Sequence, residues 1–161
     1  MEVNLVDQVI YTQNASLEID GLYVGLDNTC SVNKGMFHVY IDCDLKSFQD
    51  VVDACEKISH LVGDIYILQT SPWMWSVVSF SSHSWLEYLE IMGSFREREL
   101  AYEWMTYNKG FACLRVGRKR NLAPRIMYKI RGRKIECEHC RSIFESVLSY
   151  YNKPIIVNKG K

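Results

Sequence analysis

The spacing of apolar positions changes along the first half of the chain, and these changes predict strands around a helix. Residues 37–41 are β-branched and aromatic, which is typical of a strand. Ser47, with Asp50 three positions later, imitates a capping box and predicts a helix start. Apolar residues then recur at helical spacing, and Gly63 is expected to end this helix. They are Phe48, Val51, Val52, Cys55, Ile58 and Leu61.

Residues 65–68 and 75–80 predict two further strands, which a turn at residues 71–74 joins. The strands at residues 37–41 and 65–68 are expected to run parallel, because the helix between them makes a right-handed crossover. Shorter strands are expected on either side of a turn at residues 20–21.

The second half of the chain predicts helices followed by strands. Ser84 and Ser94 are each followed three positions later by a glutamate, which predicts two helix starts. The second of these helices is expected to end at Gly110. Its inward residues are expected to be Leu100, Ala101, Trp104 and Met105. The elements expected after it are a strand at residues 111–116, a basic loop at 117–124, a strand at 125–130 and a helix at 138–151.

Together these elements predict a single domain over residues 1–161, of the α/β (α+β) class, with an RRM- or ferredoxin-like mixed sheet and flanking helices. Its 48% hydrophobic and 24% charged residues are ordinary for a globular protein. No apolar run approaches the ~20 residues of a membrane span, and no secretory signal is evident at the start. A soluble cytoplasmic protein without membrane contact is therefore expected.

Most of the six cysteines are expected to be reduced, because a disulfide framework in a chain of this size normally accompanies a secretory signal. Cys137 and Cys140 form the one close pair, with a spacing that metal sites use. A structural Zn²⁺ needs four ligands, and the sequence offers no second close pair. A zinc site is therefore not expected.

The net charge of zero conceals an uneven distribution of charged residues. Residues 1–114 contain 6 Lys and Arg against 16 Asp and Glu, whereas residues 115–134 contain 9 Lys and Arg and no acidic residue. The basic segment favours binding of a phosphate backbone, although it also fits a solvated loop that offsets the acidic half. The candidate phosphate-binding residues are Arg115, Arg118, Lys119, Arg120, Arg125 and Lys129.

Asp42 and Asp44 follow the strand predicted at residues 37–41 and are the candidate catalytic and metal-binding residues. At positions i and i+2 of an extended strand they share one face, ~6.6 Å apart along the backbone. Two such carboxylates can hold Mg²⁺ or Mn²⁺ and leave ligand positions for substrate phosphates. The alternative is a polar strand end at which Asp44 begins a turn. His83, in a Ser-rich turn, is interpreted as structural.

The chain has no P-loop, dinucleotide fingerprint or Gly-x-Ser-x-Gly elbow. The order of its motifs nevertheless resembles the catalytic core of the archaeo-eukaryotic primase superfamily, especially small replication proteins of archaeal plasmids and viruses. The matching features are Asp42-Cys43-Asp44 at a strand end, Thr70-Ser71-Pro72 before a returning strand, and the run Leu-Arg-Val-Gly-Arg-Lys at residues 114–119. The resemblance implies a primase-like core over about residues 37–130 and nucleotidyl transfer, with two divalent metals, onto a nucleic-acid 3′ end.

Two motifs of that family are not matched. The family's His on the returning strand falls at Trp75, and His83 lies several residues later. No aspartate stands at the third acidic motif, near which Glu97 or Glu99 is the substitute. In the family the His contacts the incoming phosphate and the third acid completes the metal site. The two departures therefore predict weak or lost turnover.

The leading interpretation is a replication protein of a mobile element, in the host cytoplasm if a virus encodes it. Such a protein would bind DNA or RNA and nucleoside triphosphates, and it would use Mg²⁺ or Mn²⁺ if active. The alternatives are a non-catalytic nucleic-acid-binding module and a metal-dependent nuclease. A further alternative is an interaction protein whose acidic half and basic segment bind a protein partner or form a homodimer.

Overall fold

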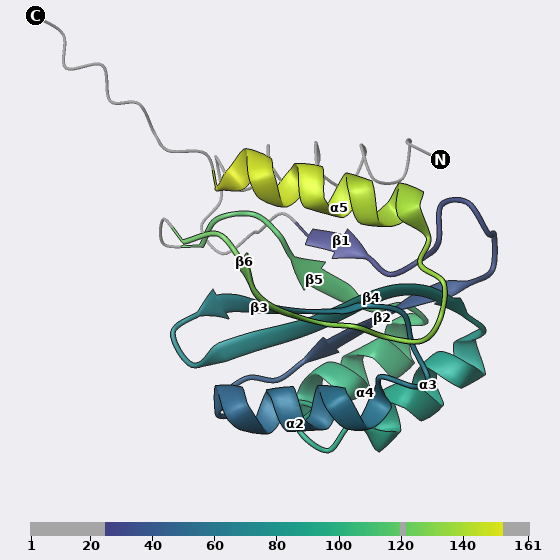
Figure 1. Cartoon of the computed structure of the whole chain (residues 1–161), viewed down its shortest axis with the longest axis horizontal. Coiled ribbons are helices and arrows are strands. Elements are labelled where there is room, and N and C mark those ends of the chain that lie inside the picture. The colour runs from purple at the N-terminus through teal and green to yellow at the C-terminus, as the bar shows by residue number, and fades with distance from the viewer. Residues whose placement is uncertain (1–24, 120–121, 153–161) are drawn as a thin grey trace, which may run out of the picture.

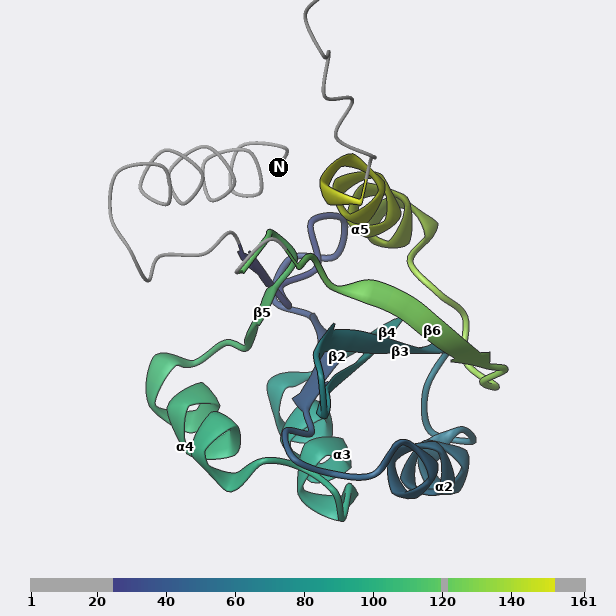
Figure 2. The same cartoon turned by 90° about the vertical axis from the view of Figure 1, so that its left-hand side faces the viewer.

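The computed structural model describes residues 25–119 and 122–152. The strands are β1 (Gly25–Asp27), β2 (Phe37–Asp42), β3 (Ile65–Ser71), β4 (Met74–His83), β5 (Cys113–Arg115) and β6 (Arg125–Ile130). The helices are α2 (Phe48–Ile58), α3 (Trp85–Ser94), α4 (Leu100–Lys109) and α5 (Glu138–Tyr151). α5 lies on one side of the central sheet, and the other three helices lie on the opposite side (Figures 1 and 2).

The central sheet has the strand order β2-β4-β3-β6, and each pair of neighbours is antiparallel. β2 and β3 run parallel to one another, as expected, but β4 lies between them. β2, α2, β3 and β4 thus form a split βαβ unit as in ferredoxin-like folds, and the α+β class is confirmed. The later strands depart from that pattern, because β6 pairs with β3 while β5 pairs with β1 in a two-stranded sheet.

Alternation along the strands divides the core into two halves. Towards the three helices, Trp75 of β4 packs on Phe48 of α2 with ring centroids 5.1 Å apart. Towards α5, the buried ring of Phe80 lies 5.1 Å from Phe144 of α5 and 6.4 Å from Tyr40 of β2. α5 is therefore attached to the sheet through an aromatic cluster centred on β4.

Several local signals in the sequence are confirmed. The Ser47 hydroxyl accepts a hydrogen bond from the Asp50 N–H (3.1 Å) and begins α2. The Ser84 hydroxyl accepts one from the Glu87 N–H (3.2 Å) and begins α3. α4 ends at Gly110, whose φ of 78° is the left-handed conformation that glycine adopts without strain. These caps act within a few residues, which is why the sequence reveals them.

The predicted end of α2 at Gly63 is wrong, because the helix ends at Ile58. The Ser59 hydroxyl donates to the Glu56 carbonyl (2.8 Å). The carbonyl groups of Ser59 and Val62 accept hydrogen bonds from the Arg133 N–H instead of continuing the helix. Tertiary contact with the segment after β6 therefore overrides the apolar periodicity in this stretch.

The predicted start and inward face of α4 are also wrong. Ser94 is the last residue of α3, and Glu99 precedes α4 without a side-chain cap. Leu100 and Trp104 are each 68% exposed, whereas Thr106 is buried. The Glu99 N–H donates to the Asp42 carbonyl (2.7 Å), and this bond fixes where α4 begins relative to β2.

Among the described residues, no helix combines the length and the apolar character that crossing a membrane requires. The strands expected around residues 20–21 lie outside the described residues, as does Arg120.

Gly132 lies where the chain beyond β6 passes the turn between α2 and β3. Its N–H donates to the Asp64 carboxylate (3.0 Å), and the Lys134 N–H donates to the Val62 carbonyl (3.0 Å). A Cβ atom at position 132 would overlap the carbonyl group of Gly63. The glycine is therefore required by the close approach of two backbone segments.

We expect Gly132→Ala to lower the free energy of unfolding by about 2 kcal/mol or more, because relief of the overlap would break these hydrogen bonds. Gly93→Ala in α3 is the matched control. A Cβ there meets nothing within 4 Å, and alanine is the better helix former by up to about 1 kcal/mol. Urea titration measures both variants, and equal stability of the two would contradict the close approach.

Candidate functional site

Three carboxylates meet at the end of β2. Asp42 is the last residue of the strand, Asp44 lies two residues beyond it, and Glu99 immediately precedes α4. One carboxylate oxygen from each residue lies within 4.8 Å of the others. The Ser76 hydroxyl on the neighbouring strand donates to Asp42 (3.1 Å). The sequence-predicted pair thus gains a third acid, Glu99, which the sequence offered only as an alternative to Glu97.

Backbone hydrogen bonds fix the loop that carries Asp44. The Leu45 N–H donates to the Trp73 carbonyl (2.9 Å), and the Cys43 N–H donates to the Trp75 carbonyl (2.9 Å). Leu45 and Trp73 have φ angles of 61° and 63°, a left-handed conformation that costs a non-glycine residue roughly 1–2 kcal/mol. Such strained positions cluster at functional sites. The two left-handed residues therefore support a functional role for this loop.

Burial and mutual repulsion shape the ionisation of the two aspartates. Burial, followed by the Asp44 and Glu99 charges, raises the pKa of Asp42 to about 7, although the Ser76 hydrogen bond lowers it. Burial and the Glu99 charge also raise the pKa of Asp44, against the effect of Lys119 and Arg115. The cluster therefore holds more negative charge than its surroundings compensate, which is the condition in which a divalent cation binds favourably.

The Arg115 side chain holds the basic loop in place through hydrogen bonds. Its guanidinium donates to the carbonyl groups of Thr70, Gly117 (2.8 Å) and Leu122 (3.0 Å). These bonds hold the basic loop against the end of β3, while the positive charge still acts on Asp44. Arg115 and Lys119, both predicted phosphate-binding residues, thus act electrostatically on Asp44.

A cavity of about 550 Å³ lies between the end of β3, the basic loop and the end of α5. Its size is within the range of small-molecule sites. Arg118 and Arg125 line it, together with Thr70, which also accepts the Arg115 hydrogen bond. Arg118 Nε donates to the Tyr151 carbonyl (3.1 Å), and Arg125 donates to the Gln69 side chain (3.1 Å).

Lys129 lies apart from the other predicted phosphate-binding residues. Its ammonium group pairs with Asp64 (3.3 Å) and lies 5.4 Å from the centroid of the Tyr66 ring. Arg120 is outside the described residues. The structure therefore divides the predicted cations between the carboxylates, the cavity and the far end of β6.

No histidine of the described chain lies beside the carboxylates. At the position where the resemblance places one, the Trp75 indole N–H donates to the Lys46 carbonyl (3.0 Å). His83 pairs with Phe37 at the opposite end of β2, where it is buried between Ser81 (2.7 Å) and Glu87 (3.4 Å). This buried position is compatible with the interpretation of His83 as a structural residue.

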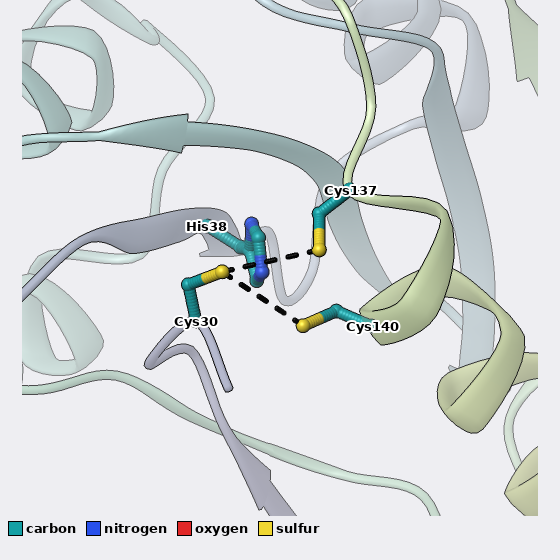
Figure 3. Close-up of side chains that lie close together, drawn as sticks. All are labelled: Cys30, His38, Cys137 and Cys140. Atoms are coloured by element: carbon teal, nitrogen blue, oxygen red, sulfur yellow. Dashed lines mark hydrogen bonds between the residues drawn. The ribbon is translucent and has the colours of Figure 1, made fainter. Parts of the chain in front are cut away.

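A second group of potential ligands gathers at that opposite end (Figure 3). Cys30 and His38 join Cys137 and Cys140, and their four ligand atoms lie within 4.8 Å of one another. The expectation that no further ligand would accompany Cys137 and Cys140 is therefore wrong. No local pattern in the sequence indicates this convergence, because Cys30 and Cys137 are more than a hundred residues apart.

We expect the stability of the metal-free protein to fall as the pH rises from about 4 to about 7. Asp42 has a higher pKa in the folded state than the ordinary value near 4, so it favours folding while protonated, and this contribution is lost through pH 7. Asp42→Asn should remove part of this fall and be more stable than the native chain at pH 8, by about 1–3 kcal/mol.

The measurement is urea unfolding with EDTA between pH 4 and 8, with the exposed Glu90→Gln as the control. Mn²⁺ should restore stability to the native chain at pH 8 and have less effect on Asp42→Asn. The same pH dependence in both variants would contradict the raised pKa.

Comparison with known proteins leaves the site to be interpreted from its own geometry, because no family model, curated protein or solved structure matches the chain.

Proposed function

We propose that this chain is a divalent-metal-dependent phosphoryl-transfer protein that acts on nucleotides or nucleic acid. The observation that carries the proposal is the convergence of Asp42, Asp44 and Glu99. Arg115, whose charge acts on Asp44, links this cluster to the cation-lined cavity through its hydrogen bond to Thr70. The proposal agrees with the resemblance to primase-polymerase replication proteins. The family has an aspartate as its third acid, and we infer that Glu99 takes that place in this chain.

Each part of the site has a separate task. Carboxylate oxygens are the ligands that Mg²⁺ and Mn²⁺ prefer, and a bound ion would polarise phosphoryl oxygens and offset the developing charge. Lys119 provides a positive charge near Asp44. Arg118 and Arg125 place positive charge in the cavity, which is large enough for part of a nucleotide.

A test uses the full chain with primed DNA or RNA templates, nucleoside triphosphates and Mn²⁺ or Mg²⁺. We expect a metal-dependent extension product. Asp44→Asn and Glu99→Gln should each lower its rate roughly 100-fold or more, because each removes a carboxylate ligand of the metal ion that offsets the developing charge in the transition state. Glu97→Gln is the matched control, since Glu97 lies two residues away and outside the carboxylate cluster.

Retention of the native rate in the Asp44→Asn, Glu99→Gln double variant would contradict the role of the carboxylates. Shortened rather than extended nucleic acid, with the same dependence on Asp44 and Glu99, would identify a metal-dependent nuclease instead.

A second candidate is nucleic-acid binding without turnover. Two observations favour it, because Trp75 occupies the position of the family's His and the N–H groups of Arg115 are held by backbone carbonyls. This candidate predicts binding that depends on the cavity cations and does not require the carboxylates.

We expect the Arg118→Gln, Arg125→Gln double variant to weaken binding to single-stranded DNA or RNA. If both cations contact phosphates, the slope of log K against log salt should become shallower by about 1.4, at roughly 0.7 per contact. Lys57→Gln, on the exposed face of α2, is the control. Fluorescence anisotropy across a salt series provides the measurement, and an unchanged slope would exclude these two arginines as phosphate contacts.

A further inference from the structure

The cluster formed by Cys30, His38, Cys137 and Cys140 has the dimensions of a tetrahedral metal site. The Cys30 sulfur lies 3.9 Å from the Cys137 sulfur and 4.0 Å from the Cys140 sulfur. A zinc ion with Zn–S bonds of ~2.3 Å in tetrahedral geometry holds its sulfur ligands about 3.8 Å apart. The thiols are thus already spaced as the ion would space them, and all four side chains converge on one point (Figure 3).

His38 presents the nitrogen that such a site needs. Its side chain is only 1% exposed, and Nδ1 lies 3.1 Å from the Ser81 carbonyl. A carbonyl only accepts, so Nδ1 carries the proton and Nε2 is left with its lone pair. Nε2 is buried and finds no hydrogen-bond partner among the described residues. An unsatisfied buried acceptor is costly, and metal-bound histidines are typically held by this kind of bond from the other nitrogen.

Hydrogen-bond donors surround two of the sulfur atoms. The Asn33 N–H donates to Cys30 (3.2 Å), the Ser82 hydroxyl donates to Cys30 (3.7 Å), and the Ser31 hydroxyl lies 3.2 Å from the Cys140 sulfur. Such donors stabilise thiolates, the form in which cysteine binds zinc. The Cys137 N–H also donates to the Phe80 carbonyl (2.8 Å) and holds the start of α5 at β4.

We propose that Cys30, His38, Cys137 and Cys140 bind one structural Zn²⁺ ion. Three sulfurs and one imidazole complete a four-coordinate shell, and a complete shell of protein ligands is characteristic of structural rather than catalytic zinc. A disulfide between two of the cysteines would instead leave the third thiol and His38 Nε2 without a role. The ligands join the loop after β1, strand β2 and the first turn of α5.

This site is distinct from the proposed catalytic carboxylates. α5 begins at the cysteines, and its other end lines the cavity through Tyr151 and Asn152. The Asn152 side chain donates to the Pro124 carbonyl (2.9 Å) in the basic loop. Zinc would therefore fix the first turn of α5, at the opposite end of the helix from the cavity.

The test measures metal content and coordination in the full chain, purified without chelators and reconstituted with Zn²⁺. We expect one equivalent of tightly bound zinc, and with Co²⁺ in its place the visible bands of a tetrahedral thiolate site. Cys140→Ser and His38→Gln should each weaken zinc binding at least about 10-fold. Cys113→Ser is the matched control, because Cys113 is a free thiol outside the cluster.

The Co²⁺ spectrum of the native chain is informative even if a ligand variant fails to fold. Absence of zinc after reconstitution, or a Co²⁺ spectrum without thiolate charge transfer, would overturn the proposal. So would a disulfide between Cys137 and Cys140 in protein alkylated directly from cells, or loss of zinc in Cys113→Ser. Asp44→Asn should keep its zinc, which separates this proposal from the function assigned to the carboxylates.

Discussion

The packing of α5 against Phe80 is the interaction that sets the arrangement of the cysteine cluster and of the cavity. Phe80 lies on the central strand β4, and its buried ring contacts Phe144 near the middle of α5. With that contact in place, the first turn of α5 reaches His38 at one end of β2. The last turn reaches the cavity at the end of β3. A helix displaced from Phe80 would separate the cysteines and open the cavity together.

Alternation along β2 places one residue of each candidate site on the same face of the sheet. His38, Tyr40 and Asp42 are spaced by two residues and therefore face the same side of the sheet. Tyr40 packs on Phe80 in the middle, His38 meets the cysteines, and Asp42 meets Asp44 and Glu99. A slip of the β2–β4 register by one residue would turn all three side chains to the other face. The antiparallel pairing of Asp42 with Ser76 is thus a condition of the carboxylate cluster.

The ionised carboxylate cluster opposes folding. Asp42 is largely buried beside two other acids, and its raised pKa reflects the free energy needed to ionise it there. Perturbed carboxylates of this kind are concentrated at functional sites, where a ligand or a substrate supplies the missing charge. The same reasoning applies to Nε2 of His38, which finds no hydrogen-bond partner in the described part of the chain and which a metal ion would satisfy.

Local features of this fold could be predicted from the sequence, whereas contacts between distant segments could not. Ser47 and Ser84 identified two helix starts, and residues 138–151 matched α5, because caps and periodicity depend on neighbouring residues. The phase of α4 was wrong, since it depends on the bond from Glu99 to Asp42 across the chain. Asp42 and Asp44 were predicted from their spacing in an extended strand, whereas the structure places Asp44 in a turn and adds Glu99 to the pair. Cys30 and His38 were missed as partners of Cys137 and Cys140 because folding alone brings them together.

We propose that Asp42, Asp44 and Glu99 hold the ion that acts on a substrate phosphate. Crystals of the full chain grown with Mn²⁺ and a nucleoside triphosphate, with anomalous diffraction recorded for manganese, would locate that ion. We expect an anomalous peak among these three carboxylates, with the triphosphate extending towards Lys119 and the arginines of the cavity. Triphosphate in the cavity with no manganese at the carboxylates, or manganese only elsewhere, would contradict it.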